Sequence, residues 1–296
     1  VAVDGEGRAN ASRPVTFAYN GGPGSSSVPI NLGGIGPRRV ATDGVSHLRA
    51  DAPIEDNPHT LLAESDVVFL DAHGTGWSVL AEDADPKKVF CTDGDADAFA
   101  RAICAWLTEN GRWSSPLYLF GESYGTVRNS VLMRLLGERG VQLTGVVMLS
   151  AVFNIAGLLN PGDDLYYLGM MPTFAATAQF FGRAGAGVDE DEWFSRAMDF
   201  TERELAPALL RGDRLGEAEE RAVAERMAAF IGLSAEHILA HHLRVDLLDF
   251  RTHLLADEGR VCGRLDTRFS SDAPSPMQSY DMWLAGEDPA DDAVEG

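Results

Sequence analysis

A serine flanked by glycines is the first feature of the sequence that could carry chemistry. Residues 121–125 read GESYG, the Gly-x-Ser-x-Gly pattern of a serine that sits on a sharp turn between a strand and a helix. Glycines suit this turn because side chains at those positions would clash. The apolar run Leu117–Phe120 precedes the motif, and a helical pattern begins at Tyr124. This context predicts a nucleophile elbow with Ser123 as the nucleophile, rather than an ordinary tight turn.

A glycine-rich loop offers a second component of the same chemistry. NGGPGSSS, at residues 20–27, ends a strand-like stretch that begins at Arg13. In hydrolases with a nucleophile elbow, a loop of this kind provides a backbone N–H that stabilises the oxyanion formed during acyl transfer. A phosphate-binding loop would continue with Gly-Lys-Ser or Gly-Lys-Thr, and this one does not. The glycines at 33, 34 and 36 do not indicate a dinucleotide site, because Pro37 stands where a helix would have to begin.

Both motifs belong to a half of the chain in which strand-like and helical patterns alternate. The predicted strands are Arg13–Asn20, Val67–Asp71, Leu117–Phe120 and Gly145–Ser150, and the predicted helices are Asp95–Asn110 and Tyr124–Leu136. Short continuous apolar runs are typical of strands that are buried on both faces of a parallel sheet. The pattern therefore predicts an α/β fold with a mostly parallel sheet.

The second half of the chain reads as a helical layer. The predicted helices are Asp191–Leu210, Glu217–Ile231, a helix capped by Ser234, and Asp246–Ala256, and no buried strand is predicted after Ser150. We therefore expect an α/β core over residues 1–160 and a helical insertion or cap over residues 161–285. The acidic residues 286–296 are expected to form a solvated tail or linker.

Composition excludes several classes of function. The 24 basic and 45 acidic residues give a net charge of −21, which argues against binding to nucleic acid. No apolar run approaches the roughly 18 residues of a membrane span. Cys91, Cys104 and Cys262 leave either one disulfide or none open. The histidines and cysteines show no metal-ligand spacing, so neither a metal nor a cofactor is expected. The sequence carries no signal for the oligomeric state.

Three motifs together resemble the serine carboxypeptidase family. They are NGGPGSSS, DAHGTGWS at residues 71–78, and LYLFGESYG at residues 117–125. The resemblance is closest to the bacterial branch, in which the first loop carries three serines, and it extends more loosely to Phe269. It implies an α/β-hydrolase fold and hydrolysis of C-terminal residues from peptides with a free C-terminus. It also favours a secreted or periplasmic location.

The resemblance implies roles for the residues of the first and third motifs. Ser123 would form the acyl-enzyme, and the backbone N–H groups of Gly22 and Tyr124 would form the oxyanion hole. The substrate's terminal carboxylate would be bound by the residues beside them, which are Asn20, the Gly21 N–H and Glu122.

The implied carboxylate clamp has one unusual member. Glu122 can donate a hydrogen bond to a carboxylate only while it is protonated, so the resemblance implies a preference for acidic pH. Gly34 occupies the position at which the better-known branch of the family has a second acid that pairs with this glutamate. The clamp is therefore expected to be incomplete or built differently in this chain.

The general base that Ser123 needs is not evident in the sequence. In this architecture an aspartate and then a histidine follow the serine, but the family's Asp-Thr-Pro and Gly-His patterns do not occur. The later histidines (His237, His241, His242 and His253) are all expected within helices, where packing or surface roles are usual, and Asp266 is expected to be structural. The predicted strands are also fewer than such a hydrolase contains. We therefore expect the chain to be a fragment without its triad Asp and His, and to be inactive or nearly so by itself.

Two alternatives to a carboxypeptidase remain open at this point. The elbow and the oxyanion loop would serve an esterase or an acyltransferase equally well, since each of these transfers an acyl group. A non-catalytic binding protein that has lost its triad would keep the same motifs.

Overall fold

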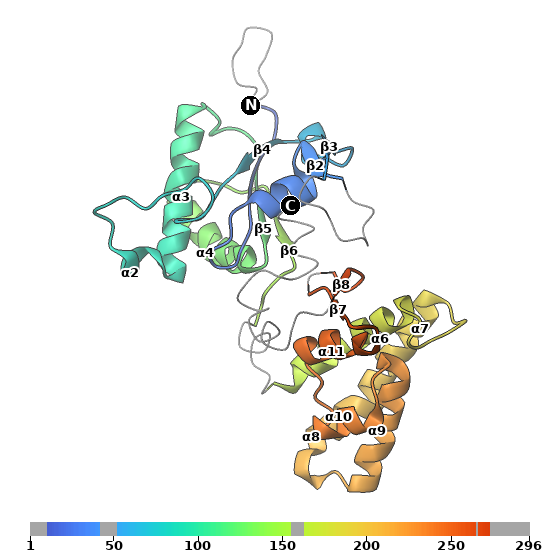
Figure 1. Cartoon of the computed structure of the whole chain (residues 1–296). Coiled ribbons are helices and arrows are strands. Elements are labelled where there is room, and N and C mark those ends of the chain that lie inside the picture. Colours follow the sequence, from blue (N-terminus) through green and yellow to red (C-terminus); the bar gives the residue numbers. More distant parts are fainter. Residues whose placement is uncertain (1–10, 42–51, 155–162, 265, 273–296) are drawn as a thin grey trace. The chain divides into compact units, whose positions relative to one another are not determined.

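The computed structural model describes residues 11–41, 52–154, 163–264 and 266–272 (Figure 1). Contacts divide the chain into two compact units. We call residues 11–41 and 52–153 the sheet unit, and the described residues from 154 to 272 the helical unit. The predicted boundary at residue 160 and the acidic tail lie outside the described residues.

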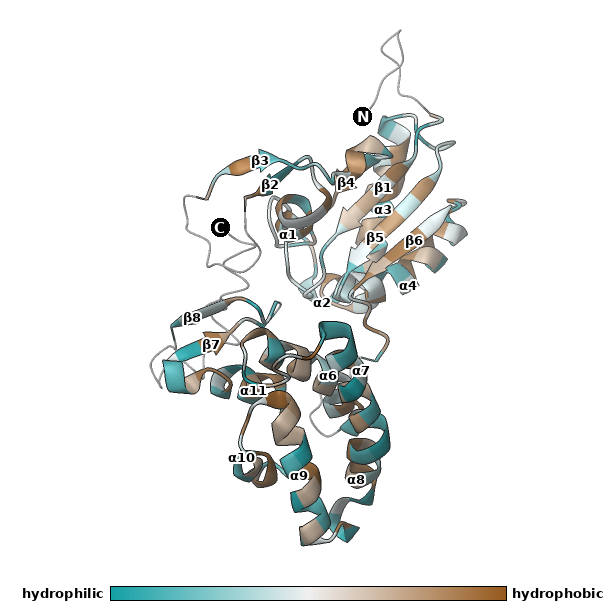
Figure 2. Ribbon diagram, turned by 90° about the vertical axis from the view of Figure 1, so that its right-hand side faces the viewer, coloured by the Kyte–Doolittle hydropathy of each residue, from teal (hydrophilic) through white to brown (hydrophobic). Residues whose placement is uncertain are grey.

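The sheet unit contains a four-stranded parallel sheet in the order β4-β1-β5-β6, and its four strands lie side by side in Figure 2. The strands are β1 (Val15–Tyr19), β4 (Asp66–Phe69), β5 (Leu117–Glu122) and β6 (Gly145–Leu149). All four were predicted, and every residue of β1 is buried, as expected for a central strand of such a sheet. The fold is therefore of the predicted α/β class.

Two helices cover this sheet. They are α3 (Thr92–Glu109) and α4 (Tyr124–Glu138), which pack against each other. Their apolar side chains share one core with β1 and β5, including Phe17, Phe99, Ile103, Leu119 and Leu132. Smaller elements complete the unit, namely α1 (Val28–Ile30), η1 (Asn31–Ile35), β2 (Arg38–Val40), β3 (Ile54–Asp56), η2 (Leu61–Ala63) and α2 (Pro86–Val89).

The register of the sheet sets the position of both motifs. Tyr19 at the end of β1 lies opposite Gly121 in β5, and the two strands are parallel. The chain segments that leave these strands therefore emerge at the same edge, one as the glycine-rich loop and the other as the elbow.

The helical unit is built from α6 (Asp164–Phe180), α7 (Glu190–Phe200), η3 (Thr201–Leu205), α8 (Ala206–Arg211), η4 (Gly212–Arg214), α9 (Glu217–Ile231), α10 (Ala235–Ala240), α11 (Leu247–His253) and η5 (Ala256–Glu258). Its core is apolar, and the rings of Phe174 and Phe250 stack at its centre with their centroids 4.1 Å apart. As predicted, Ser234 caps α10, because its Oγ accepts a hydrogen bond of 3.1 Å from the His237 N–H.

Three details of the helical unit differ from expectation. The single helix predicted over Asp191–Leu210 is interrupted by the π-helical turn η3, after which Pro207 in α8 has no N–H to donate to an α-helical hydrogen bond. His241 is the C-cap that follows α10, and His242 lies outside any helix with a φ of 48°. A short antiparallel hairpin of β7 (Arg260–Cys262) and β8 (Ser270–Asp272) was also missed, because three-residue strands carry too little pattern to be recognised.

Two further properties concern the described part of the chain as a whole. No helix in it is both long and apolar enough to cross a membrane. All three cysteines are free thiols, which decides between the alternatives of one disulfide and none.

Candidate active site

The elbow serine occupies a strained position between β5 and α4. Ser123 has φ 53° and ψ −121°, a conformation that residues with a side chain rarely adopt. The turn is closed so tightly that a Cβ on Gly121 would lie 2.4 Å from the Gly125 carbonyl oxygen. Glycine is therefore required at this end of the motif, as the sequence predicted.

The glycine-rich loop packs directly against the elbow. A Cβ on Gly21 would lie 2.4 Å from the Tyr124 nitrogen and 2.7 Å from the Glu122 carbonyl oxygen, so only glycine permits this approach. Gly22 follows with a φ of +102°. Neither the Gly22 N–H nor the Tyr124 N–H donates a hydrogen bond within the described part of the chain. Both remain available as donors, and the Tyr124 N–H also lies at the positive end of the α4 dipole.

Asn20 connects the two motifs through a hydrogen bond. Its Nδ2 donates to Glu122 Oε2 over 3.0 Å, while its Oδ1 accepts from the Ile30 N–H over 2.9 Å. The amide is therefore oriented by the start of the loop's helical turn and holds the glutamate beside the nucleophile. Asn20, Gly21 and Glu122, for which the resemblance implies binding of a substrate carboxylate, lie next to Ser123 and Tyr124.

A buried arginine lies behind this arrangement, and sequence reasoning missed it. Arg128 has no exposed surface, its Nη1 donates to the Asn20 carbonyl oxygen over 2.9 Å, and its Nε donates to Asp95 over 2.7 Å. Its guanidinium carbon also lies 4.1 Å from the centre of the Phe99 ring. The Arg128 side chain thus holds the backbone at the start of the glycine-rich loop in place.

A second buried pair supports the same region. The Tyr19 hydroxyl donates to the Asn129 Oδ1, and the Asn129 amide donates to the Val147 carbonyl oxygen over 3.3 Å. Burial raises the pKa of Tyr19 well above its ordinary value, although the positive charge of Arg128 opposes this shift. Tyr19 therefore stays neutral and serves as a hydrogen-bond donor that links β1 to α4.

The second motif, at residues 71–78, is hydrogen-bonded to the end of the glycine-rich loop. The Asp71 carboxylate accepts hydrogen bonds from the Ser27 N–H over 2.8 Å and from the Trp77 N–H over 3.1 Å. Ser27 Oγ in turn donates to the Leu70 carbonyl oxygen over 2.5 Å. Asp71 thereby joins the last serine of the glycine-rich loop to the segment after β4.

A cleft of about 340 Å³ adjoins the elbow and the loop. Tyr124 and His73 border this cleft. Trp77, in the second motif, is 96% exposed and borders a different hollow. The complete lining consists of Pro23, Gly24, Ala72, His73, Val89, Phe90, Cys91, Thr92, Asp95, Tyr124 and Arg128.

The structure also describes Gly34, the position at which the resemblance led us to note the absence of a second acid. Gly34 lies in η1, and its carbonyl oxygen accepts a hydrogen bond of 2.7 Å from the Asn57 amide. The only side-chain hydrogen-bond partner of Glu122 within the described residues is Asn20. An amide therefore contacts the glutamate directly.

The other residues considered for the triad have local partners in the helical unit. Asp266 is held by Arg268, whose Nη2 lies 2.6 Å from its Oδ2, and this hydrogen bond lowers the pKa of the aspartate. His237, His241 and His253 surround Asp249. Within the described residues of the sheet unit, the Ser123 hydroxyl makes no hydrogen bond to a candidate base.

The parallel sheet with a nucleophile elbow and a glycine-rich loop at its carboxyl edge places the chain in the α/β-hydrolase class. Within that class, the family model for serine carboxypeptidases matches residues 5–162, which contain all three motifs. The chain therefore belongs to the serine carboxypeptidase family, a family of peptidases. No curated protein matches the sequence.

Proposed function

We propose that this protein is a serine-type carboxypeptidase that removes C-terminal residues from peptides with a free carboxylate. The observation that carries the proposal is the hydrogen bond between Asn20 and Glu122 directly beside Ser123. An esterase needs the nucleophile and the oxyanion donors, but it has no use for a carboxyl and an amide held together at the position of a substrate's terminus.

In the proposed reaction, Ser123 Oγ attacks the carbonyl carbon of the last peptide bond. The Gly22 and Tyr124 N–H groups, together with the α4 dipole, stabilise the negative charge that develops on the carbonyl oxygen. The serine proton passes through the general base to the leaving amine as the C–N bond breaks, and water then hydrolyses the acyl-enzyme. Asn20, the Gly21 N–H and a protonated Glu122 hold the terminal carboxylate so that only the last bond reaches the serine.

This mechanism requires a general base, and none of the described residues of the sheet unit is hydrogen-bonded to Ser123 Oγ. We therefore propose that the base and the acid that orients it are supplied by residues outside the described part of this unit. The sheet unit by itself should then hydrolyse peptides very slowly or not at all.

The test uses the protein expressed from its complete gene and pairs of peptides that differ only in a free or an amidated C-terminus. We expect hydrolysis of the free peptides only, and a loss of at least about 10⁴-fold on Ser123→Ala. Equal cleavage of both peptides would contradict carboxylate recognition. Turnover of esters without peptides would favour the esterase alternative, and failure of Ser123 to react with a fluorophosphonate would favour a non-catalytic protein.

A second variant tests the proposed role of Glu122 in binding the substrate's terminal carboxylate. Glu122→Gln keeps an acceptor for Asn20 and gains an amide donor that is independent of pH. We expect its KM for free peptides near neutral pH to fall roughly tenfold relative to the wild type, since a hydrogen bond to a charged group contributes about 1.5–3 kcal/mol. An unchanged pH dependence of KM would show that Glu122 does not contact the substrate.

A further inference from the structure

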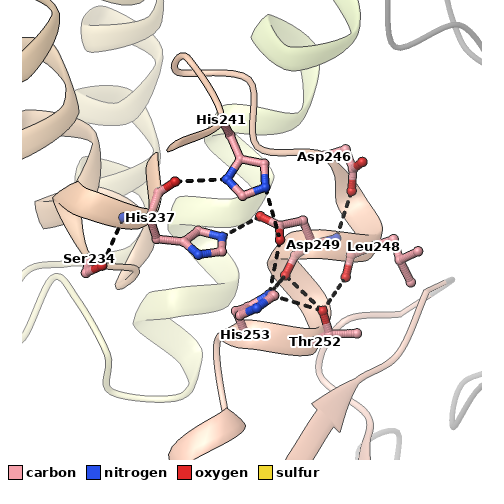
Figure 3. Close-up of polar contacts among 8 residues, drawn as sticks. All are labelled: Ser234, His237, His241, Asp246, Leu248, Asp249, Thr252 and His253. Carbon is pink, nitrogen blue, oxygen red and sulfur yellow. Dashed lines mark hydrogen bonds and ion pairs between the residues drawn. The ribbon is translucent and has the colours of Figure 1, made fainter. Parts of the chain in front are cut away.

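Three histidines surround one aspartate in the helical unit, on two helices that are separate in the sequence. His237 and His241 come from α10 and its C-terminal end, and Asp249 and His253 come from α11 (Figure 3). His237 Nε2 lies 2.7 Å from Asp249 Oδ2, and His241 Nε2 lies 3.7 Å from Asp249 Oδ1. One ligand atom each from His237, Asp249 and His253 lie within 4.8 Å of one another.

The outer hydrogen bond of His241 prepares its ring to bind a cation, whereas His253 presents its Nδ1 directly to Asp249 Oδ1 over 3.1 Å. His241 Nδ1 lies 2.9 Å from the His237 carbonyl oxygen, and its Nε2 faces Asp249. A carbonyl oxygen can only accept, so this Nδ1 carries a proton and the neutral ring keeps its lone pair on Nε2. Backbone carbonyls play this same role behind metal-binding histidines, because they fix the tautomer and the direction of the ring.

The spacing also suits a small transition-metal ion. In a tetrahedral site with bonds of about 2.0 Å, neighbouring ligand atoms lie about 3.3 Å apart. The separations of 2.7 Å and 3.7 Å between the Asp249 oxygens and two imidazole nitrogens bracket that value, so small side-chain rotations are sufficient. Imidazole nitrogens with one carboxylate are ligands that favour zinc and similar ions over magnesium or calcium.

Partial exposure allows an ion to enter. The side chains of His237 and Asp249 are 22% and 14% exposed, while those of His241 and His253 are more exposed. We propose that His237, His241, Asp249 and His253 form a zinc-type metal site that joins α10 to α11. With four protein ligands the site would be closed to substrate, so the ion would stabilise the helical unit and take no part in the acyl transfer at Ser123.

The sequence contains the signal for this site, although the expectation was that no ligand spacing exists. His237 and His241 are four residues apart, and so are Asp249 and His253, which places each pair on one side of its helix. Each pair alone looks like an ordinary helical surface. Only the contact between the His237 and Asp249 side chains reveals that the two pairs face each other.

The test is a titration of the full chain with Zn²⁺ by isothermal calorimetry, followed by Co²⁺ as a spectroscopic probe of geometry. We expect one ion per chain, a visible Co²⁺ spectrum of the tetrahedral type, and a midpoint of thermal unfolding raised by about 5 °C at saturating Zn²⁺. Mg²⁺ at the same concentration should produce neither heat nor a shift of the midpoint.

The variants that test the assignment are His237→Ala and the nearly isosteric Asp249→Asn. Each should weaken Zn²⁺ binding by more than about tenfold, because even the outer partners of metal ligands contribute 10–100-fold. His242→Ala is the matched control, since His242 is 80% exposed and contacts Glu220 instead of Asp249. The proposal is overturned if the wild type binds no Zn²⁺ at a 1:1 ratio, or if Asp249→Asn binds as tightly as His242→Ala.

Discussion

The two units of the chain use buried charge differently. In the sheet unit, Arg112 and Arg128 are completely buried, and each is paired with a carboxylate, that of Asp66 or Asp95. In the helical unit, the charged pairs lie at the surface and the core consists of stacked and interlocking apolar side chains. Arg251, which is buried and donates to the Cys262 carbonyl oxygen, is the exception.

This difference follows from what each unit must hold in place. Helices satisfy their own backbone hydrogen bonds, so apolar patterning is sufficient to assemble them. The loops at the carboxyl edge of the sheet have no such internal ladder, and their carbonyls need donors from elsewhere. Arg128 supplies such a donor to the Asn20 carbonyl, whereas Arg112 donates to the Arg13 carbonyl before β1, at the opposite edge of the sheet.

Of the variants that test this difference in buried charge, Arg128→Met is expected to have the largest effect on stability. Removing one partner of a buried pair leaves Asp95 and the Asn20 carbonyl without their donor, so the free energy of unfolding of the sheet unit should fall by about 3–5 kcal/mol. Hydrogen exchange followed by mass spectrometry would localise the loss to the sheet unit.

The matched control is Arg134→Met, on the same helix. Arg134 forms an exposed pair with Glu138 at 2.9 Å, and its loss should cost less than about 1 kcal/mol. Equal effects of the two variants would show that buried charge does not hold the loops of the sheet unit.

The next effect concerns alkaline pH and the helical unit. Burial raises the pKa of Cys262 from 9.0 to about 12. Between these values the unfolded thiol ionises while the folded one stays protonated, so the unit's stability is complete below pH 9 and declines as the pH rises toward 12. The loss is on the order of 2–4 kcal/mol, because each pKa unit corresponds to about 1.4 kcal/mol.

Urea unfolding at several pH values, followed by helical circular dichroism, measures this decline. Cys262→Ala should flatten the alkaline part of the profile, whereas Cys91→Ala, at an exposed position, should leave it unchanged. The same slope in all three proteins would assign the decline to other groups.

The smallest expected effect is an increase in the stability of the sheet unit, and it concerns the backbone strain at the elbow. Ser123→Gly should stabilise the sheet unit by about 1 kcal/mol, since glycine tolerates a φ of 53° that strains a serine. Ser130→Gly, at an exposed position inside α4, should instead destabilise the unit by about 0.5–1 kcal/mol. If Ser123→Gly were also destabilising, the elbow would store no strain.

Apolar patterning predicted the four strands and α9 over its full length, and the family resemblance implied the residues that lie beside Ser123. It failed where polar side chains are buried. In α4 the apolar Leu132 is buried, but so are the polar Arg128 and Asn129, which are more deeply buried than Val127 or Val131. A polar residue inside a core follows the partner it binds rather than a period, and that partner lies far away in the sequence. The His237–Asp249 contact escaped prediction for the same reason.

The bonds of Asp71 have a consequence for protein engineering. The Asp71 carboxylate accepts a hydrogen bond from Ser27, and Gly21 packs closely against Tyr124. The three motifs are therefore in direct contact and form one structural unit. Grafting the GESYG pentapeptide alone onto another parallel sheet would transfer Ser123 without the glycine-rich loop that packs against it. A successful graft would have to include all three motifs and also Arg128, which donates a hydrogen bond to the Asn20 carbonyl oxygen.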